Sequence, residues 1–189
     1  MFTLNDLPAI KDWLERTTTE FAGVAKEWTK QQIPKLLNLF PPYLGAGIRV
    51  TGYDESHTWF DVEMDLTPWN KNYVGVHFGG SLYSMCDPFF MMILMHNLGN
   101  DYVVWDRAAE IQFKRPGQTK VHARFELSPE RIAELAAEAK EERVIQPVFR
   151  VDVLDTTNRA VARVSKTIYI KYVGDGPRRS RQARPEFLK

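Results

Sequence analysis

The sequence predicts an α+β fold in which a strongly curved antiparallel sheet surrounds one long buried helix. Residues 82–98 are apolar on nearly every side of a helical projection, and a helix without a polar face is a buried one. Residues 58–66 alternate apolar with acidic side chains, which is typical of a half-buried antiparallel strand. A single apolar helix needs cover on several sides, and a curved sheet can supply it.

The region before this core is predicted to be helical, because apolar residues recur in it at three- and four-residue spacing. We expect Pro34 to begin the last of these helices and Pro41-Pro42 to end it. The predicted organisation is a helical extension over residues 1–40, one domain over 41–173, and a flexible basic tail over 174–189.

Strand-like alternation defines the rest of the domain. Residues 48–53 are expected to form a hairpin with 58–66, and Gly99-Asn100 is expected to end the buried helix. A short helix is predicted after Ser128, which is a favourable N-cap residue. The remaining strands are predicted at residues 102–115, 120–127, 148–154 and 160–172, the first with Trp105, Ala109, Ile111 and Phe113 on one face. This order of elements is that of the hotdog fold.

Composition excludes several classes of protein. The 189 residues carry a net charge of +1, and most of the basic excess lies in the tail, so the body has no charge signature of a nucleic-acid-binding protein. The single cysteine, Cys86, excludes an intramolecular disulfide. No apolar run approaches the ~20 residues of a membrane helix, and no secretory signal is evident, so we expect a cytoplasmic protein that does not bind membranes.

Functional residues are predicted where the buried helix begins. Asp87 is the one ionisable acid within the apolar run, and a carboxylate in such a place needs either a charged or hydrogen-bonding partner or a catalytic function. Gly79 and Gly80 precede the helix, where unpaired N–H groups and the helix dipole favour an anion. An isolated acid that follows an anion-favouring glycine turn is the strongest functional signal in the sequence.

The stretch from Asn72 to Asp87 resembles hotdog-fold acyl-CoA thioesterases of the phenylacetate-pathway type. It is most similar to a branch labelled tetrameric acyl-CoA thioesterases. The resemblance spans about residues 39–172 and includes Phe40-Pro-Pro-Tyr-Leu-Gly45 and Phe113-Lys-Arg-Pro116. An acid seven residues after Gly80 and an amide eight residues before it both match the family spacing. One position departs, because Phe78 stands where the family has histidine and His77 lies one place earlier.

The resemblance implies a role for each residue. Asp87 would be the general base or nucleophile, Gly79 with Gly80 would hold the oxyanion, and Asn72 would orient water or the thioester. His77 would help to polarise the carbonyl. Substrate contacts are expected from Phe78, Ser81, Lys114 and Arg115, with coenzyme A as part of the substrate and with no cofactor and no metal.

Spacing also predicts an oligomer. A helix rises about 10 Å between Gly80 and Asp87, too far for one acyl carbon to touch both within a protomer. If both groups act on one substrate, the oxyanion donors and the carboxylate come from different subunits of a homodimer. The family resemblance extends this expectation to a dimer of dimers.

Several alternatives stay open. Asp87 followed by Pro88 could simply cap a new helical segment, Asn72 could be a turn residue, and His77 a loop histidine. Cys86 fits a core position better than a nucleophile. The rival functions are a non-catalytic acyl-CoA or acyl-chain binding module and, with less support, an enoyl-CoA hydratase or dehydratase.

Overall fold

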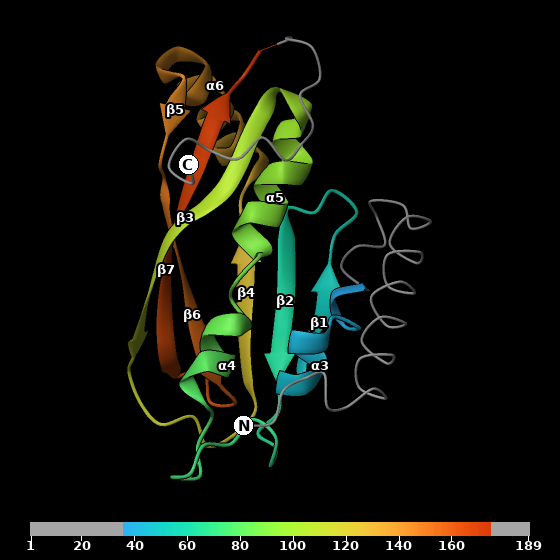
Figure 1. Ribbon diagram of the computed structural model, residues 1–189, viewed down its shortest axis with the longest axis vertical. Helices are drawn as coiled ribbons and strands as arrows, with labels where there is room; N and C mark the ends of the chain where they lie inside the picture. The colour runs from blue at the N-terminus through green and yellow to red at the C-terminus, as the bar shows by residue number, and fades with distance from the viewer. Residues whose placement is uncertain (1–35, 175–189) are drawn as a thin grey trace, which may run out of the picture.

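A computed structural model describes residues 36–174 as one seven-stranded antiparallel sheet curved around a helical segment (Figure 1). The strand order is β1-β2-β4-β6-β7-β3, and β5 pairs with β7. The elements are α3 (Pro41–Ala46), β1 (Ile48–Tyr53), β2 (Trp59–Met64), α4 (Gly79–Ser84), α5 (Phe89–Leu98), the 3-10 helix η3 (Gly99–Asp101), β3 (Tyr102–Phe113), β4 (Val121–Glu126), α6 (Pro129–Glu142), β5 (Val144–Ile145), β6 (Val148–Asp155) and β7 (Ala160–Tyr172). The predicted helical extension up to residue 35 and the tail from residue 175 lie outside the described residues.

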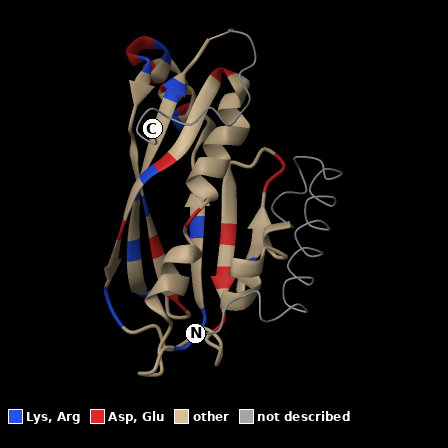
Figure 2. Ribbon diagram, viewed as in Figure 1, with Lys and Arg blue, Asp and Glu red and all other residues tan. Residues whose placement is uncertain are grey.

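Helix α5 supplies the centre of the core, as its apolar sequence predicted. The ring of Phe89 stacks on that of Phe125 from β4, with centroids 4.7 Å apart, and Phe90 stacks on Phe149 from β6 at 5.1 Å. Such aromatic pairs add stability beyond the area they bury. Helices α4 and α5 hold no Lys, Arg, Asp or Glu (Figure 2). No helix in the described part of the chain is long and apolar enough to cross a bilayer.

The long helical segment that begins at Gly79 is confirmed, but it is not continuous. Helix α4 ends at Ser84 and α5 begins at Phe89, so residues 85–88 form a break. Pro88 explains the break, because it has no N–H to donate and its ring disfavours a helical residue before it. The alternative that Asp87-Pro88 begins a new helical segment anticipates this break, although Pro88 and not Asp87 is the residue before α5.

Strand β3 lies at the edge of the sheet and contains a β-bulge between Asp106 and Ala108. Before the bulge Asp106 pairs with Ile168, and after it Ala109 pairs with Lys166, so Asp106 and Ala109 share the face that points to the core. A bulge shifts the alternation of a strand by one residue. The prediction that Trp105 shares a face with Ala109 is therefore wrong.

The segment before β1 also differs from its prediction. Pro41-Pro42 was predicted to end a helix, but the two prolines occupy the first two positions of α3. Proline is tolerated there because the first N–H groups of a helix have no intrahelical acceptor. Gly47, with φ 72°, then caps α3 and leads into β1. The short strand β5 was not predicted.

Candidate active site

Asp87 lies in the break between α4 and α5, with its side chain 54% exposed in the protomer. The expectation of a carboxylate buried within a helix is therefore wrong for the single chain, because the break turns the side chain outward. Its Oδ1 accepts a hydrogen bond from Lys166 Nζ at 3.0 Å. Pro88, not Asp87, is the residue preceding α5, and no side chain caps that helix. Asp87 thus has an ion-pair partner instead of a capping role.

Lys166 is the partner that sequence reasoning missed. It is fully buried on β7, on the side of the strand that also presents Val164 and Ile168 to the core. Its Nζ lies 3.2 Å from Asp106 Oδ2, in addition to its bond with Asp87. A buried ammonium must be paired, and here two carboxylates pair it. The signal was present in the sequence: a lysine at an inward position of an otherwise apolar alternation.

Asp87, Lys166 and Asp106 form a cluster in which burial and charge have opposite effects on the pKa values of Lys166 and Asp106. Burial tends to lower the pKa of Lys166, but Asp106 and Asp87 outweigh it and hold that pKa above its ordinary value. Burial raises the pKa of Asp106, and the charge of Lys166 offsets only part of that effect. Asp106 Oδ1 is buried without a hydrogen-bond partner among the described residues. The cluster therefore holds Lys166 charged between two acids of different exposure.

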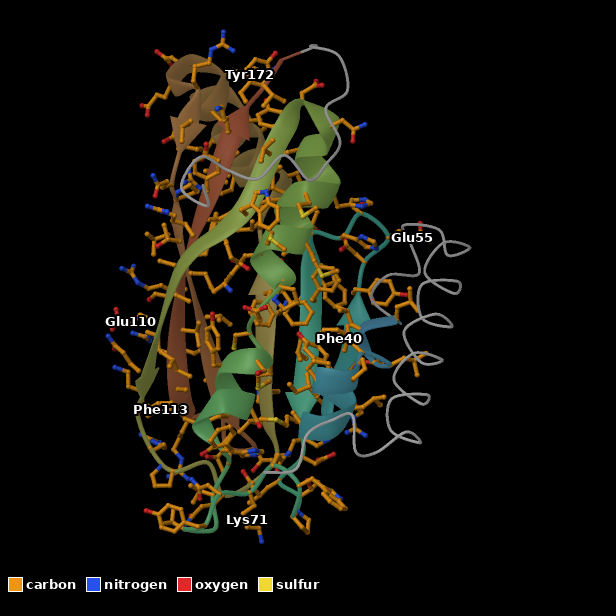
Figure 3. The ribbon with its side chains drawn as sticks, in the orientation of Figure 1. Phe40, Glu55, Lys71, Glu110, Phe113 and Tyr172 are labelled. Carbon is orange, nitrogen blue, oxygen red and sulfur yellow. The ribbon has the colours of Figure 1, made fainter. Side chains whose placement is uncertain are left out.

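The glycine pair begins α4 and leaves its amides free. No acceptor is found among residues 36–174 for the N–H groups of Gly79 and Gly80, whereas Ser81 N–H already bonds to Phe78 O at 3.0 Å. A Cβ on Gly79 would lie 2.7 Å from Phe113 Cζ, and one on Gly80 would collide with the Phe78 ring. Figure 3 shows Phe113 at the end of β3. Glycine is needed at both positions because aromatic rings cover them.

His77 is tied to the neighbouring loop. Its side chain is buried, its Nε2 lies 2.9 Å from Thr119 O, and its backbone N–H bonds to Gly117 O at 2.9 Å. Burial lowers the pKa of His77, with the Thr119 hydrogen bond acting against it, so the imidazole is neutral at pH 7. These contacts favour the loop-histidine alternative, and the predicted role in polarising a carbonyl stays a prediction.

Asn72 is likewise engaged in its own loop. Its Oδ1 accepts from the backbone N–H of Val74 at 3.1 Å and of Val76 at 3.2 Å. This is the geometry of a side chain that stabilises a turn, which was the alternative to a catalytic amide. Positioning of water or thioester by Asn72 stays a prediction.

The predicted substrate contacts are scattered around this centre. Phe78 is 56% exposed beside the glycines, while Ser81 is buried one residue further along α4. Lys114 and Arg115 are exposed after β3, and Lys114 Nζ bonds to Gln112 Oε1 at 2.7 Å. Substrate contacts by these four residues stay a prediction. Cys86 is completely buried, and burial raises the pKa of its thiol, which favours the core alternative over a nucleophile.

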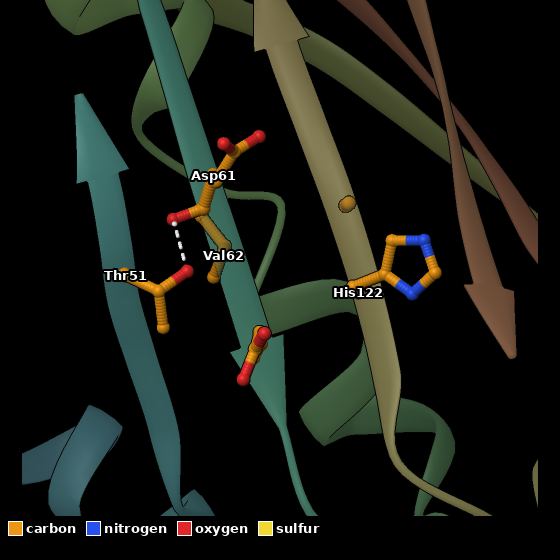
Figure 4. Close-up of a pocket in the computed structure, with 6 residues that line it drawn as sticks. Thr51, Asp61, Val62 and His122 are labelled. Atoms are coloured by element: carbon orange, nitrogen blue, oxygen red, sulfur yellow. Dashed lines mark hydrogen bonds between the residues drawn. The ribbon is translucent and has the colours of Figure 1, made fainter. Parts of the chain in front are cut away.

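A cavity of about 280 Å³ lies elsewhere, on the outer face of the sheet (Figure 4). Its polar lining includes Asp61, Glu63 and His122, which alternate with core-facing residues of β2 and β4. The sheet thus separates this cavity from α4 and α5. Within residues 36–174, no three His, Cys, Asp or Glu side chains lie close enough to share a metal ion.

Comparison with known proteins supports the fold. The family described as a domain of unknown function, DUF4442, matches residues 29–170, and the chain belongs to this family. A Pseudomonas aeruginosa protein of unknown function, called a probable thioesterase, is similar at TM-score 0.65 and 16% identity over 76% of this chain and 93% of its own. A Haemophilus influenzae thioesterase matches at TM-score 0.55 and 16% identity over 79% and 94%.

The Escherichia coli PaaI protein of the phenylacetic acid degradation operon is a more distant structural neighbour. It matches at TM-score 0.50 and 17% identity, over 76% of this chain and 92% of its own. At such identities the likeness shows the fold alone. The predicted hotdog fold is confirmed. A search of curated proteins finds no match.

Proposed function

We propose that this protein is an acyl-CoA thioesterase that hydrolyses a thioester to a free acid and coenzyme A. The observation that carries the proposal is the ion-paired carboxylate of Asp87, presented to solvent at a helix break that follows a glycine turn with free amides. Similarity to structures named as thioesterases supports the reaction class. The spacing of Asp87 and Gly79 matches the acyl-CoA thioesterases that the sequence resembles.

The proposed chemistry uses Asp87 in one of two ways. As a general base it takes a proton from water, whose oxygen attacks the thioester carbon. As a nucleophile it attacks that carbon itself and forms an anhydride, which water then hydrolyses. In both routes the carbonyl oxygen becomes negative and is held by the N–H of Gly79, helped by that of Gly80. The thiolate of coenzyme A leaves and takes up a proton.

We further propose that the site is composite, with Asp87 of one subunit facing Gly79 of another. The support is the predicted separation of the two groups within a chain and the long edge strand β3. An edge strand presents unpaired N–H and C=O groups to a second chain. The phosphates of coenzyme A would meet Lys114 and Arg115, since basic side chains bind phosphate.

The test is the Asp87→Asn variant, assayed by thiol release across acyl-CoAs from acetyl to palmitoyl, with aryl thioesters included. We expect hydrolysis to fall about 10²–10⁴-fold, because the amide can neither accept a proton nor attack. Asp152→Asn is the matched control: it breaks an ion pair with Arg163, at 2.7 Å on the exposed face, and should leave hydrolysis unchanged. Equal rates for Asp87→Asn and the parent would refute the proposal.

A second candidate function is binding of acyl-CoA without turnover. It is favoured by the engagement of Asn72 and His77 in loop contacts, which leaves fewer free polar groups near the glycines. Calorimetric titration of an acyl-CoA, run beside the hydrolysis assay, separates the two functions. Tight binding with no thiol released would favour the binding module, whereas hydration of an added enoyl-CoA would indicate a hydratase.

A further inference from the structure

We infer that Lys166 and Asp106 are positioning residues: Lys166 holds the Asp87 carboxylate in its reactive orientation, and Asp106 holds the Lys166 ammonium in place. This inference deepens the proposed function and rests on it for its kinetic readout. Neither residue is part of the motif through which the chain resembles thioesterases. Both are identified by their contacts in the fold alone.

Orientation is the first part of the argument. Lys166 Nζ holds Asp87 Oδ1 at 3.0 Å, and no hydrogen bond is found for Oδ2 among the described residues. The side chain of Lys166 is rigidly placed, because it is fully buried and extends from the centre of β7. One carboxylate oxygen is thus fixed by the protein, and the other is left for water or the thioester. A reacting group held in this way loses little freedom at the transition state.

The second part is what fixes the ammonium itself. Asp106 Oδ2 lies 3.2 Å from Lys166 Nζ, so a second carboxylate from β3 pairs the buried ammonium. Lys166 is thus held between β3 and the break at residues 85–88, and Asp106 supports the orientation of Asp87 through Lys166.

Bulge geometry explains why Asp106 can take part. It precedes the irregularity in β3 and pairs with Ile168, two residues from Lys166 on the same face of β7. Without the shift in alternation after Asp106, the inward-facing residues of β3 beyond it would be displaced to the other face. The bulge thus lets β3 place an acid beside Lys166 and still keep the half-buried Ile111 on the same face of the sheet.

The test uses four variants of the full chain: Lys166→Met, Asp106→Asn, the two combined, and Lys166→Arg. The first readout is kcat and KM, measured separately with an acyl-CoA. The second is the crystal structure of each variant, in which the orientation of the Asp87 carboxylate is compared with that in the parent. The second readout needs no activity, so it separates failure of this inference from failure of the proposed function.

Lys166→Met is expected to lower kcat about 10-fold or more with little change in KM and to leave the Asp87 carboxylate reoriented, because its hydrogen bond is lost. Asp106→Asn is expected to lower kcat less, because the ammonium keeps Asp87 as a partner. The combined variant should match Lys166→Met, and Lys166→Arg should retain most of the parental kcat, because the guanidinium can still donate to Asp87. A merely structural role predicts no such rescue by arginine.

Each other outcome counts against the inference. An unchanged kcat with an unchanged Asp87 orientation in Lys166→Met would overturn it, and so would a Lys166→Arg variant as impaired as Lys166→Met. If Lys166→Met does not fold, the near-isosteric Asp106→Asn decides the question, and an unchanged kcat with an unchanged Lys166–Asp87 contact there overturns the inference. A parent enzyme without hydrolysis would refute the proposed function, while the variant structures would still test the orientation of Asp87.

Discussion

Asp155 is the residue whose charge is most clearly tied to folding. It begins the turn between β6 and β7, where its Oδ1 accepts from Thr157 Oγ1 at 2.6 Å, Arg159 N at 3.0 Å and Thr157 N at 2.8 Å. These hydrogen bonds, that of Thr157 Oγ1 first, lower the pKa of Asp155 to about 2, below its ordinary 3.8. A carboxyl with a depressed folded-state pKa stabilises the fold above its unfolded-state pKa.

Replacing Asp155 with Asn is therefore expected to lower stability at pH 7, with a fall in melting temperature of a few degrees. The difference from the parent should shrink as the pH falls from about 4 to about 2, because the parent carboxyl is then protonated as well. Thermal unfolding monitored by circular dichroism across this range measures the effect. A difference that stays constant with pH would show that the hydrogen bonds act through geometry and not through charge.

At the same scale, the sequence predicted Asp87 but not its surroundings. The acid and the glycines were found because each is an exception to the residue types around it. Lys166 and Asp106 were missed because their contacts join β3, β7 and the break at residues 85–88, which are far apart in the chain. An inward lysine in β7 was visible from alternation, yet its partner depends on a bulge that no residue pattern announces.

Helix α3 offers a comparison of two glycines within one element. Gly45 lies inside the helix, and a Cβ there would meet no described atom within 4 Å. Gly47 caps the same helix with φ 72°, a conformation that side chains with a Cβ rarely adopt. The two positions therefore differ in the backbone conformation that they require, and not in how closely other atoms would approach an added Cβ.

Gly45→Ala is expected to stabilise the protein by up to about 1 kcal/mol, because alanine loses less backbone entropy in a helix. Gly47→Ala is expected to destabilise it by about 1 kcal/mol, since alanine is strained at positive φ. Urea unfolding midpoints of the two variants and the parent measure both effects. Midpoints that move in the same direction would contradict this assignment of the α3 C-cap.

Helices and strands with a clear hydrophobic period were predicted to within a few residues, but the places where the helix breaks and strand β3 bulges were not. Strands β1, β2, β4, β6 and β7 follow the alternation, and Ser128 caps α6 by accepting from Arg131 N at 3.2 Å, as expected from the sequence. The break at residues 85–88 was anticipated only as the alternative that Asp87-Pro88 begins a new helical segment, and the bulge in β3 was not predicted, because strand-like alternation was read straight through residues 102–115. The helix break positions Asp87, and the bulge in β3 adjoins Asp106.

For the whole molecule, the order of strands and helices was enough to predict the hotdog fold. An apolar helical segment in the middle of the chain must be buried, and a sheet that curves around it is one of the few arrangements that can bury it. Sequence alone could not supply the exposure of Asp87, because that depends on where the helix breaks. In a single chain Asp87 faces outward and Gly79 begins α4 on the far side of the break, so the proposed composite site requires a second copy.

Complementation between two inactive variants tests this composite site. Asp87→Asn removes the carboxylate, and Gly79→Val places a side chain where Phe113 Cζ would lie 2.7 Å from even a Cβ. In a heterodimer of the two, one site combines both defects, while the other combines the intact Asp87 of one chain with the intact Gly79 of its partner. Heterodimers purified through two different tags should then regain about half of the parental activity per dimer. If each site lay within one chain, every site would carry one defect, and the purified heterodimer would be as inactive as either variant alone.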